Sequence, residues 1–282
     1  MSFDHLEPQT PMRMPAANAY AAAALARSRT AAESSRTRFD VPYGPDPKHR
    51  LDLYLPRAPA TGTPVLIFLH GGSCTHGYKV WMGFMAPALV DLPAIFVAAN
   101  YRLAPTHRFP AQLDDTLAIL AWTAAEIGSH GGDRRRVFIG GHSAGGHLAG
   151  LACLRRDLWS RHGLAEDAVR ACFPVSTTFD YRGIPEDAGS FLARPGDAAA
   201  ASPVAYVEGN RVPFLIAWGS SDFERARGTS REMASALTKA GGVAREMEVP
   251  GADHFQMSLD LGDAAHPWTR AVRAWLATGV PA

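Results

Sequence analysis

A serine between glycines lies at the junction of an apolar run and a helix-favouring segment. The pentapeptide Gly141-His142-Ser143-Ala144-Gly145 follows the apolar residues 137–140 and precedes a second Gly-rich stretch. A strand–turn–helix unit with this G-x-S-x-G spacing strains the serine backbone and points its hydroxyl out of the sheet. The N-terminus of the following helix favours negative charge that develops nearby. This context predicts that Ser143 is a nucleophile.

A nucleophilic serine needs a base, and the base needs an acid that orients it. In folds with this serine motif the acid precedes the base along the chain. Asp222 follows the apolar run 214–218, where a strand would end, and Glu224 is a rival two residues later. His254 lies in the loop after the last expected strand. We therefore predict Ser143, Asp222 and His254 as the catalytic residues.

A tripeptide with two glycines, His70-Gly71-Gly72, follows the apolar run 65–69. Acyl transfer needs hydrogen-bond donors where the carbonyl oxygen becomes negative, and backbone N–H groups of glycines can approach it closely. We predict an oxyanion hole made by the N–H groups of Gly71, Gly72 and Ala144. No spacing of His, Cys and carboxylates suggests a metal, and no motif indicates a cofactor, so we expect neither.

Short apolar runs alternate with helical stretches along most of the chain. The expected strands are 38–43, 51–55, 65–69, 94–99, 137–139, 169–175, 214–218 and, more weakly, 246–249. The expected helices are 111–127, 143–154, 225–239 and 267–276. The first two strands flank a turn-rich tip and indicate a hairpin. The alternation predicts an α/β protein with a doubly wound, mostly parallel sheet.

Two segments depart from this alternation. Residues 1–36 hold three prolines and the Ala-rich run 16–26, which favours an N-terminal arm or short helix near the mouth of the site, or a frayed terminus. Residues 37–282 then form the α/β domain. The pattern breaks again over about 176–206, which predicts a small cap insertion. Its aromatic residues Phe179, Tyr181 and Phe191 either line a pocket or form the cap's own core.

Composition narrows the function classes. Lys plus Arg number 28 and Asp plus Glu 27, a net charge of +1 that gives no reason to expect a nucleic-acid partner. The three cysteines, Cys74, Cys153 and Cys172, form no metal or redox motif and fit a reducing compartment. We find neither a signal-peptide pattern nor an apolar run long enough to span a membrane. We therefore expect a cytoplasmic protein with a small-molecule partner, either monomeric or a homo-oligomer.

Taken together, the motifs resemble those of the α/β-hydrolase esterases over roughly residues 38–278. NYRLAP followed by FPA, at 100–105 and 109–111, resembles the hormone-sensitive-lipase-like esterases. GHSAGGHLA at 141–149 resembles the kynurenine formamidase (arylformamidase) and feruloyl-esterase-like branch. The other matching motifs are HGG at 70–72, GGD at 131–133, GSSD at 219–222 and DHF at 253–255. The resemblance implies the α/β-hydrolase fold and the same three catalytic residues.

Two departures from the family patterns bear on the substrate. The formamidase branch usually has an aromatic pair after HGG, whereas this chain has Ser73-Cys74. The lipase-like branch usually has Asp before the serine, whereas this chain has His142. We therefore expect a carboxylesterase-type serine hydrolase for small-acyl esters with aromatic or activated leaving groups, with an arylformamidase or aryl-amide hydrolase as the alternative. A non-catalytic ligand-binding protein is disfavoured by the complete set of catalytic residues, and an acyltransferase is left open.

Overall fold

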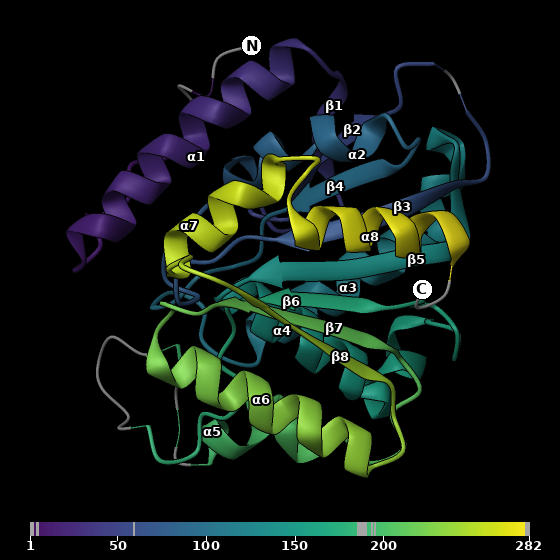
Figure 1. Cartoon of the computed structure of the whole chain (residues 1–282). Helices are drawn as coiled ribbons and strands as arrows, with labels where there is room; N and C mark the ends of the chain where they lie inside the picture. The colour runs from purple at the N-terminus through teal and green to yellow at the C-terminus, as the bar shows by residue number, and fades with distance from the viewer. Residues whose placement is uncertain are drawn as a thin grey trace.

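A single eight-stranded sheet forms the centre of the chain (Figure 1). The computed structural model describes residues 3, 6–58, 60–184, 191–192, 194 and 196–279. The strands are β1 Arg36–Pro42, β2 Arg50–Leu55, β3 Thr63–Leu69, β4 Ile95–Ala99, β5 Gly132–His142, β6 Cys172–Val175, β7 Phe214–Gly219 and β8 Ala244–Val249. Their order is β1-β2-β4-β3-β5-β6-β7-β8. The pairs β1–β2 and β2–β4 are antiparallel, and every other neighbouring pair is parallel.

Helices cover both faces of the sheet. One face packs against α3 Ala111–Glu126, α4 Ala144–Leu154 and α6 Glu224–Lys239. The other face packs against α1 Pro15–Glu33, α2 Pro87–Val90, α7 His254–Leu259, α8 Pro267–Thr278 and the 3₁₀ helix η1 Lys79–Met85. The remaining helices are short: α5 Asp197–Ala200, η2 Ile127–His130, η3 Arg156–His162, η4 Pro203–Tyr206 and η5 Asp260–Gly262. This arrangement confirms the predicted doubly wound α/β fold.

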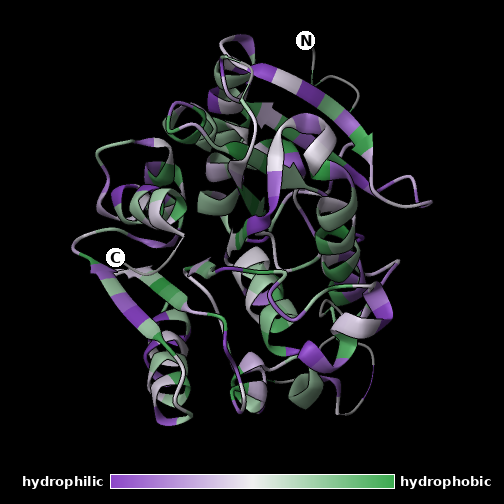
Figure 2. Ribbon diagram, turned by 90° about the vertical axis from the view of Figure 1, so that its right-hand side faces the viewer, coloured by the Kyte–Doolittle hydropathy of each residue, from purple (hydrophilic) through white to green (hydrophobic). Residues whose placement is uncertain are grey.

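Burial explains which strands the sequence showed most clearly. Every residue of β3, β4, β6 and β7 is buried, because helices lie on both sides of these inner strands. The edge strands β1 and β8 alternate between exposed and partly buried residues. Figure 2 shows the same contrast, with hydrophobic residues concentrated in the inner elements. Continuous apolar runs therefore identified the strands that carry the site.

Two strands begin three or more residues away from the predicted position. β6 begins at Cys172 rather than at residue 169, because Val169 and its neighbours only approach the sheet end, where the Arg170 N–H donates to the Val137 carbonyl. β5 begins at Gly132, and its first half carries three arginines that extend past the buried part of the sheet. A polar run at a strand end leaves no hydrophobic signal, which is why the prediction missed it.

The N-terminal helix α1 packs on the elements beside the carboxyl ends of the strands. The Tyr20 hydroxyl and the Ser258 hydroxyl lie 3.0 Å apart, which links α1 to α7. The Ser28 hydroxyl accepts a hydrogen bond of 2.9 Å from the Phe84 N–H in η1. The predicted boundary at residues 36 and 37 and the cap limits of 176–206 stay predictions. Residues 185–190, 193 and 195 of that cap lie outside the described residues.

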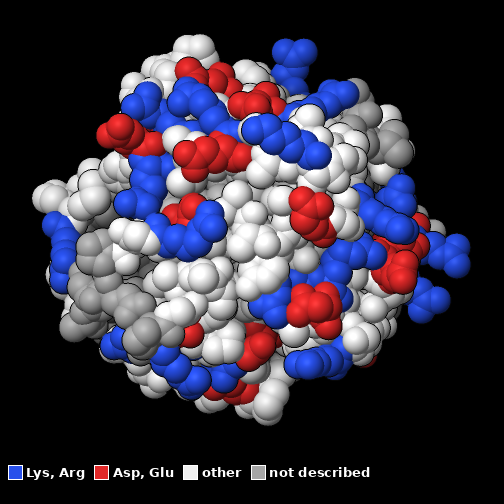
Figure 3. Space-filling model, turned by 90° about the horizontal axis from the view of Figure 1, so that it is seen from below, with Lys and Arg blue, Asp and Glu red and all other residues white. Residues whose placement is uncertain are grey.

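The surface carries charges of both signs. On the face seen in Figure 3, Lys and Arg lie among Asp and Glu instead of gathering by sign. Within the ranges described above, none of the helices combines the length and apolar character that crossing a bilayer requires. The same ranges contain no group of three His, Cys, Asp or Glu side chains arranged to hold a metal ion.

Gly145 provides a test of how tightly α4 packs on the sheet. A Cβ atom at this position would lie 2.2 Å from the Leu69 carbonyl oxygen, which is backbone and cannot move aside. We expect Gly145→Ala to lower the free energy of unfolding by about 3 kcal/mol or more, measured by urea denaturation. Gly228→Ala in α6 is the matched control, because a Cβ atom there meets nothing within 4 Å. The control should gain up to about 1 kcal/mol from helix propensity, and equal effects of the two substitutions would contradict the packing.

Candidate active site

Ser143 occupies the single residue between β5 and α4. Its backbone has φ 54° and ψ −117°, a conformation that a residue with a side chain rarely adopts. The Ser143 N–H donates a hydrogen bond of 2.8 Å to the Val175 carbonyl at the end of β6, which anchors this backbone. Within the described part of the chain, the Ser143 hydroxyl forms no hydrogen bond. The predicted nucleophile thus has the strained turn that its motif requires, and its hydroxyl has no partner among the described residues.

The predicted acid and base meet. Asp222 lies just after β7 and His254 is the first residue of α7, and 2.7 Å separates Asp222 Oδ1 from His254 Nδ1. Both side chains are buried. The neighbouring Asp253 is the N-cap of α7, since its carboxylate accepts hydrogen bonds from the Phe255 and Gln256 N–H groups. Asp253 therefore fixes the start of the helix that presents His254, and Asp222 orients the ring.

Opposing effects act on the Asp222 carboxyl. Burial by itself raises its pKa, but the hydrogen bond and charge of His254, together with the Ser176 hydroxyl and the Phe223 N–H, lower the pKa further than burial raises it. The net result is a pKa below the ordinary value of an aspartate. The Phe223 N–H also donates to Asp222 Oδ1, at 2.7 Å. Asp222 therefore carries its negative charge at neutral pH and can stabilise a protonated His254.

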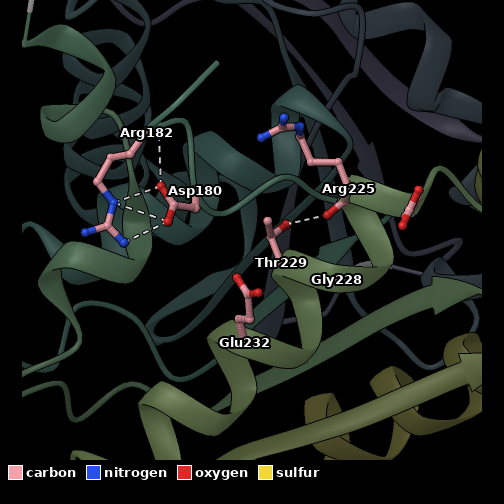
Figure 4. A pocket seen from close by; sticks show the side chains of 7 residues that line it. Asp180, Arg182, Arg225, Gly228, Thr229 and Glu232 are labelled. Carbon is pink, nitrogen blue, oxygen red and sulfur yellow. Dashed lines mark hydrogen bonds and ion pairs between the residues drawn. The ribbon is translucent and has the colours of Figure 1, made fainter.

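Glu224, the rival acid, lies in a different place. It lines an open surface pocket of about 390 Å³ between the segment after β6 and the first turns of α6 (Figure 4). The other lining residues are Asp180, Arg182, Arg225, Gly228, Thr229 and Glu232. Neither Ser143 nor His254 lines this pocket. Of the two candidate acids, Asp222 is therefore the one that is hydrogen-bonded to His254 in the described structure.

His142, the residue before Ser143, contacts the candidate base directly. The centroids of the His142 and His254 rings are 4.7 Å apart, and 3.0 Å separates His142 Nε2 from the His254 carbonyl oxygen. Burial and then the charge of His254 lower the pKa of His142 to about 3. A neutral His142 therefore donates Nε2–H to that carbonyl and supports His254 without competing for its proton. No sequence signal distinguishes this role, because it depends on where α7 packs.

The predicted oxyanion residues converge on Ser143 from two elements. A Cβ atom built on Gly71 would lie 3.2 Å from the Ser143 Cβ, so the Gly71 backbone passes directly beside the serine. Gly72 has φ 110°, in the region that favours glycine. Ala144 is the first residue of α4, where a backbone N–H has no partner within the helix. The assignment of Gly71, Gly72 and Ala144 as donors stays a prediction, and their placement is compatible with it.

A buried pair of aromatic rings supports the loop that carries Gly71 and Gly72. Tyr101 stacks on His70 with ring centroids 4.4 Å apart, and the Tyr101 hydroxyl donates a hydrogen bond of 2.8 Å to the His70 carbonyl. The two histidine nitrogens differ: Nδ1 lies 2.7 Å from the Gly71 carbonyl oxygen, whereas Nε2 is buried. Burial lowers the pKa of His70 to about 4, so the ring is neutral. Tyr101 of the NYRLAP motif thus supports the loop that carries His70 and Gly71.

The aromatic residues of the site are not those that the sequence suggested. Phe179 is fully buried in the hydrophobic core. Tyr181 and Phe191 pack on each other and on His147, and they join the same hydrophobic core. Instead, Phe223 lies on the His254 ring, with centroids 4.4 Å apart, and 43% of its surface is exposed. Phe223 directly follows the predicted acid, but a lone aromatic residue has no spacing from which its contact with His254 could be predicted.

Comparison with known proteins identifies the family. A family model described as the alpha/beta hydrolase fold matches residues 66–258. The chain therefore belongs to the α/β-hydrolase fold family, as the motifs indicated. The solved structure of a hyperthermophilic esterase from the archaeon Pyrobaculum calidifontis covers 94% of this chain and 93% of its own, with a TM-score of 0.76 and 22% identity. At that identity the likeness shows the fold alone.

The curated relatives that the chain matches include esterases and a formamidase. Esterase LipC of Mycobacterium tuberculosis is 33% identical over 268 residues, or 85% of this chain and 64% of LipC. Esterase LipQ of the same organism is 32% identical, and the match covers 58% of its length. The chain thus spans about 60% of these two relatives. A kynurenine formamidase of Salmo salar is 26% identical, over 84% of this chain and 81% of its own.

The position of Asp222 leads to a direct test of the acid. We expect Asp222→Asn to lower kcat by about 10³- to 10⁴-fold, because an asparagine no longer fixes the His254 tautomer or stabilises its protonated form. Glu224→Gln is the matched control and should keep kcat within about twofold, since Glu224 lines the surface pocket. Both measurements use phenyl acetate, with circular dichroism to verify folding. The reverse ranking of the two variants would assign the acid to Glu224.

Proposed function

We propose that this chain is a serine hydrolase that cleaves small-acyl carboxylic esters with aromatic leaving groups. The observation that carries the proposal is the Asp222–His254 hydrogen bond of 2.7 Å, formed at the same end of the sheet as the strained Ser143. A catalytic serine needs this combination of a strained turn and an oriented base. The esterases among its relatives support the reaction class.

The proposed reaction proceeds through an acyl-enzyme. His254 accepts the Ser143 proton while Ser143 Oγ bonds to the acyl carbon, and the carbonyl oxygen becomes an oxyanion. The N–H groups of Gly71, Gly72 and Ala144 stabilise that oxyanion. When the intermediate collapses, the bond to the leaving group breaks and His254 donates the proton to the departing oxygen. Water then repeats the sequence on the acyl-enzyme and releases the acid.

The aromatic leaving group is supported by Phe223. His254 donates its proton to the departing oxygen, so the leaving group must lie beside the imidazole. The partly exposed ring of Phe223 lies against that imidazole, and the Phe255 ring is 5.3 Å from it. Aromatic rings attract one another by about 0.5–1.5 kcal/mol beyond simple burial. A phenyl or naphthyl leaving group would therefore find a matching surface at the point where it departs.

The small acyl group is supported by the cap side. Tyr181 and Phe191 pack on His147, one turn after Ser143 in α4, and fill the space above this helix. His147 itself is tied to the chain before η4, with 2.6 Å between its Nε2 and the Ala201 carbonyl oxygen. This packing supports a short acyl pocket rather than a long channel. Cys74, at the position where the formamidase branch carries a bulky residue, is fully buried.

Hydrolysis of aryl formamides is the second candidate. It is favoured by the Salmo salar kynurenine formamidase, which aligns over most of its own length. The same catalytic steps apply, with formyl as the acyl group and an aromatic amine as the leaving group. Phe223 would contact that amine as it would contact a phenol, so the contact does not separate the two candidates. Comparing phenyl formate with formanilide as substrates would do so.

The nucleophile is tested by substitution. Ser143→Ala should reduce kcat on phenyl acetate by about 10³-fold or more, because the covalent intermediate can no longer form. A fluorophosphonate probe should label the wild-type protein and leave the variant unlabelled. Ser129→Ala, at an exposed serine after α3, is the control and should keep full activity. Wild-type turnover by Ser143→Ala would overturn the proposed function.

The substrate class is tested by paired kcat/KM values, which measure differential binding of the transition state. Phenyl butyrate should exceed phenyl palmitate by at least about tenfold, or ~1.4 kcal/mol. Phe223→Ala should lower kcat/KM for phenyl acetate about three- to tenfold while changing that for ethyl acetate by less than twofold.

Val243→Ala is the matched control for Phe223→Ala, because Val243 is similarly exposed, at 49%, but lies before β8. It should leave both acetates unchanged. A preference for palmitate would refute the small acyl group. Equal losses on phenyl and ethyl acetate in Phe223→Ala would refute the aromatic leaving group, and the triad would still stand in either case.

A further inference from the structure

The segment before α1 lies against the loop that follows the proposed oxyanion glycines. Gln9 makes two hydrogen bonds to one peptide residue of this loop. Its Nε2–H donates to the Gly77 carbonyl oxygen at 3.1 Å, and its Oε1 accepts from the Gly77 N–H at 2.8 Å. The two residues are 68 positions apart in the sequence. A side-chain amide that satisfies both the donor and the acceptor of one residue fixes the position and the orientation of that backbone.

Neighbouring contacts extend this clamp to both sides of Gly77. The Thr10 hydroxyl lies 3.3 Å from His76 Nε2, and the Tyr78 hydroxyl donates to the Glu7 carbonyl oxygen. The arm from residue 7 to residue 10 thus contacts three consecutive loop residues. Gln9 alone among these contacts holds the loop backbone itself with both of its polar atoms.

Gly77 in turn packs directly on the oxyanion loop. It has φ 111°, and a Cβ atom at this position would lie 2.3 Å from His70 Nδ1 and 2.7 Å from the Gly71 carbonyl oxygen. The turn between them is closed by hydrogen bonds from the N–H groups of Thr75 and His76 to the Gly72 carbonyl, at 3.0 and 2.9 Å. A shift of Gly77 would therefore move Gly71 and Gly72 with it.

We infer that Gln9 is a positioning residue that sets the geometry of the oxyanion hole through Gly77. This inference rests on the proposed function, because it requires that Gly71 and Gly72 stabilise an oxyanion. The chain of contacts runs from the Gln9 amide to the Gly77 backbone and from there to Gly71 beside Ser143. A misplacement of about 1 Å among catalytic groups can lower a rate on the order of 100-fold, so a contact outside the site can have a large effect.

The expected effect of changing Gln9 is on the stability of the transition state. This distinguishes a positioning role from a purely structural one. Gln9→Met keeps the length of the side chain and removes both hydrogen bonds. We expect it to lower kcat on phenyl acetate about tenfold or more, with KM within about twofold. The affinity for phenylboronic acid, which forms a tetrahedral adduct on the serine, should fall by the same factor as kcat. The midpoint of thermal unfolding should stay within a few degrees of wild type.

Two variants accompany this measurement. Gln9→Glu keeps the acceptor for the Gly77 N–H and loses the donor to its carbonyl, so it should also lower kcat and boronate affinity together. It replaces Gln9→Met if that variant does not fold. Arg13→Ala is the matched control, since Arg13 is an exposed residue of the same segment, and it should behave as wild type.

The outcomes separate this inference from the proposed function. If the wild-type protein hydrolyses no ester, the proposed function fails. If the wild type is active and Ser143→Ala is inactive, but Gln9→Met retains kcat and boronate affinity, only the role of Gln9 is overturned. A loss confined to KM or to thermal stability, without a change in boronate affinity, overturns it equally.

Discussion

The conformation of one residue, Ser143, constrains the surrounding fold. With φ 54° it must turn the chain from β5 into α4 within a single position, so the helix starts almost in contact with the strand ends. The hydrogen bond from its N–H to Val175 ties the turn to β6, and Gly145 lets α4 approach β3. Because β3 and β6 are the two neighbours of β5, the loop after β3 passes on one side of the serine. The loop after β7 delivers Asp222 on the other.

Few of the buried groups near Ser143 carry an ionic charge. His70, His142 and His147 are fully buried, and burial lowers their pKa values to about 4, 3 and 4. All three rings are therefore neutral at physiological pH and act as shaped hydrogen-bonding groups. The ionised Asp222 lies against His254, the base of the proposed triad. Several histidines near a serine therefore need not all act as bases.

Much of this arrangement was predictable because it depends on where strands end. Inner strands read as apolar runs and parallel strands share one carboxyl edge. Asp222 follows such a run, whereas His254 follows the edge strand β8, which the sequence showed only weakly. The contact of His142 with His254 could not be predicted from the sequence. It depends on the packing of α7, whose six residues are too short for a periodic pattern. Gln9 and Phe223 were missed for a similar reason. Their partners are set by packing between distant segments, and a single polar or aromatic residue has no spacing to read.

The contacts of α1 have a consequence for the order of events during synthesis. Tyr20 pairs with Ser258, 238 residues later, and Arg27 donates to the Leu259 carbonyl, 232 residues later. Both partners belong to the helix that begins with His254. Helix α1 must therefore wait until the 232 to 238 residues up to its partners in α7 have been synthesised before it can dock there, and closing so long a loop is a late event. A nascent chain that still lacks α7 also lacks His254, so the proposed catalytic residues come together only after α7 has been synthesised.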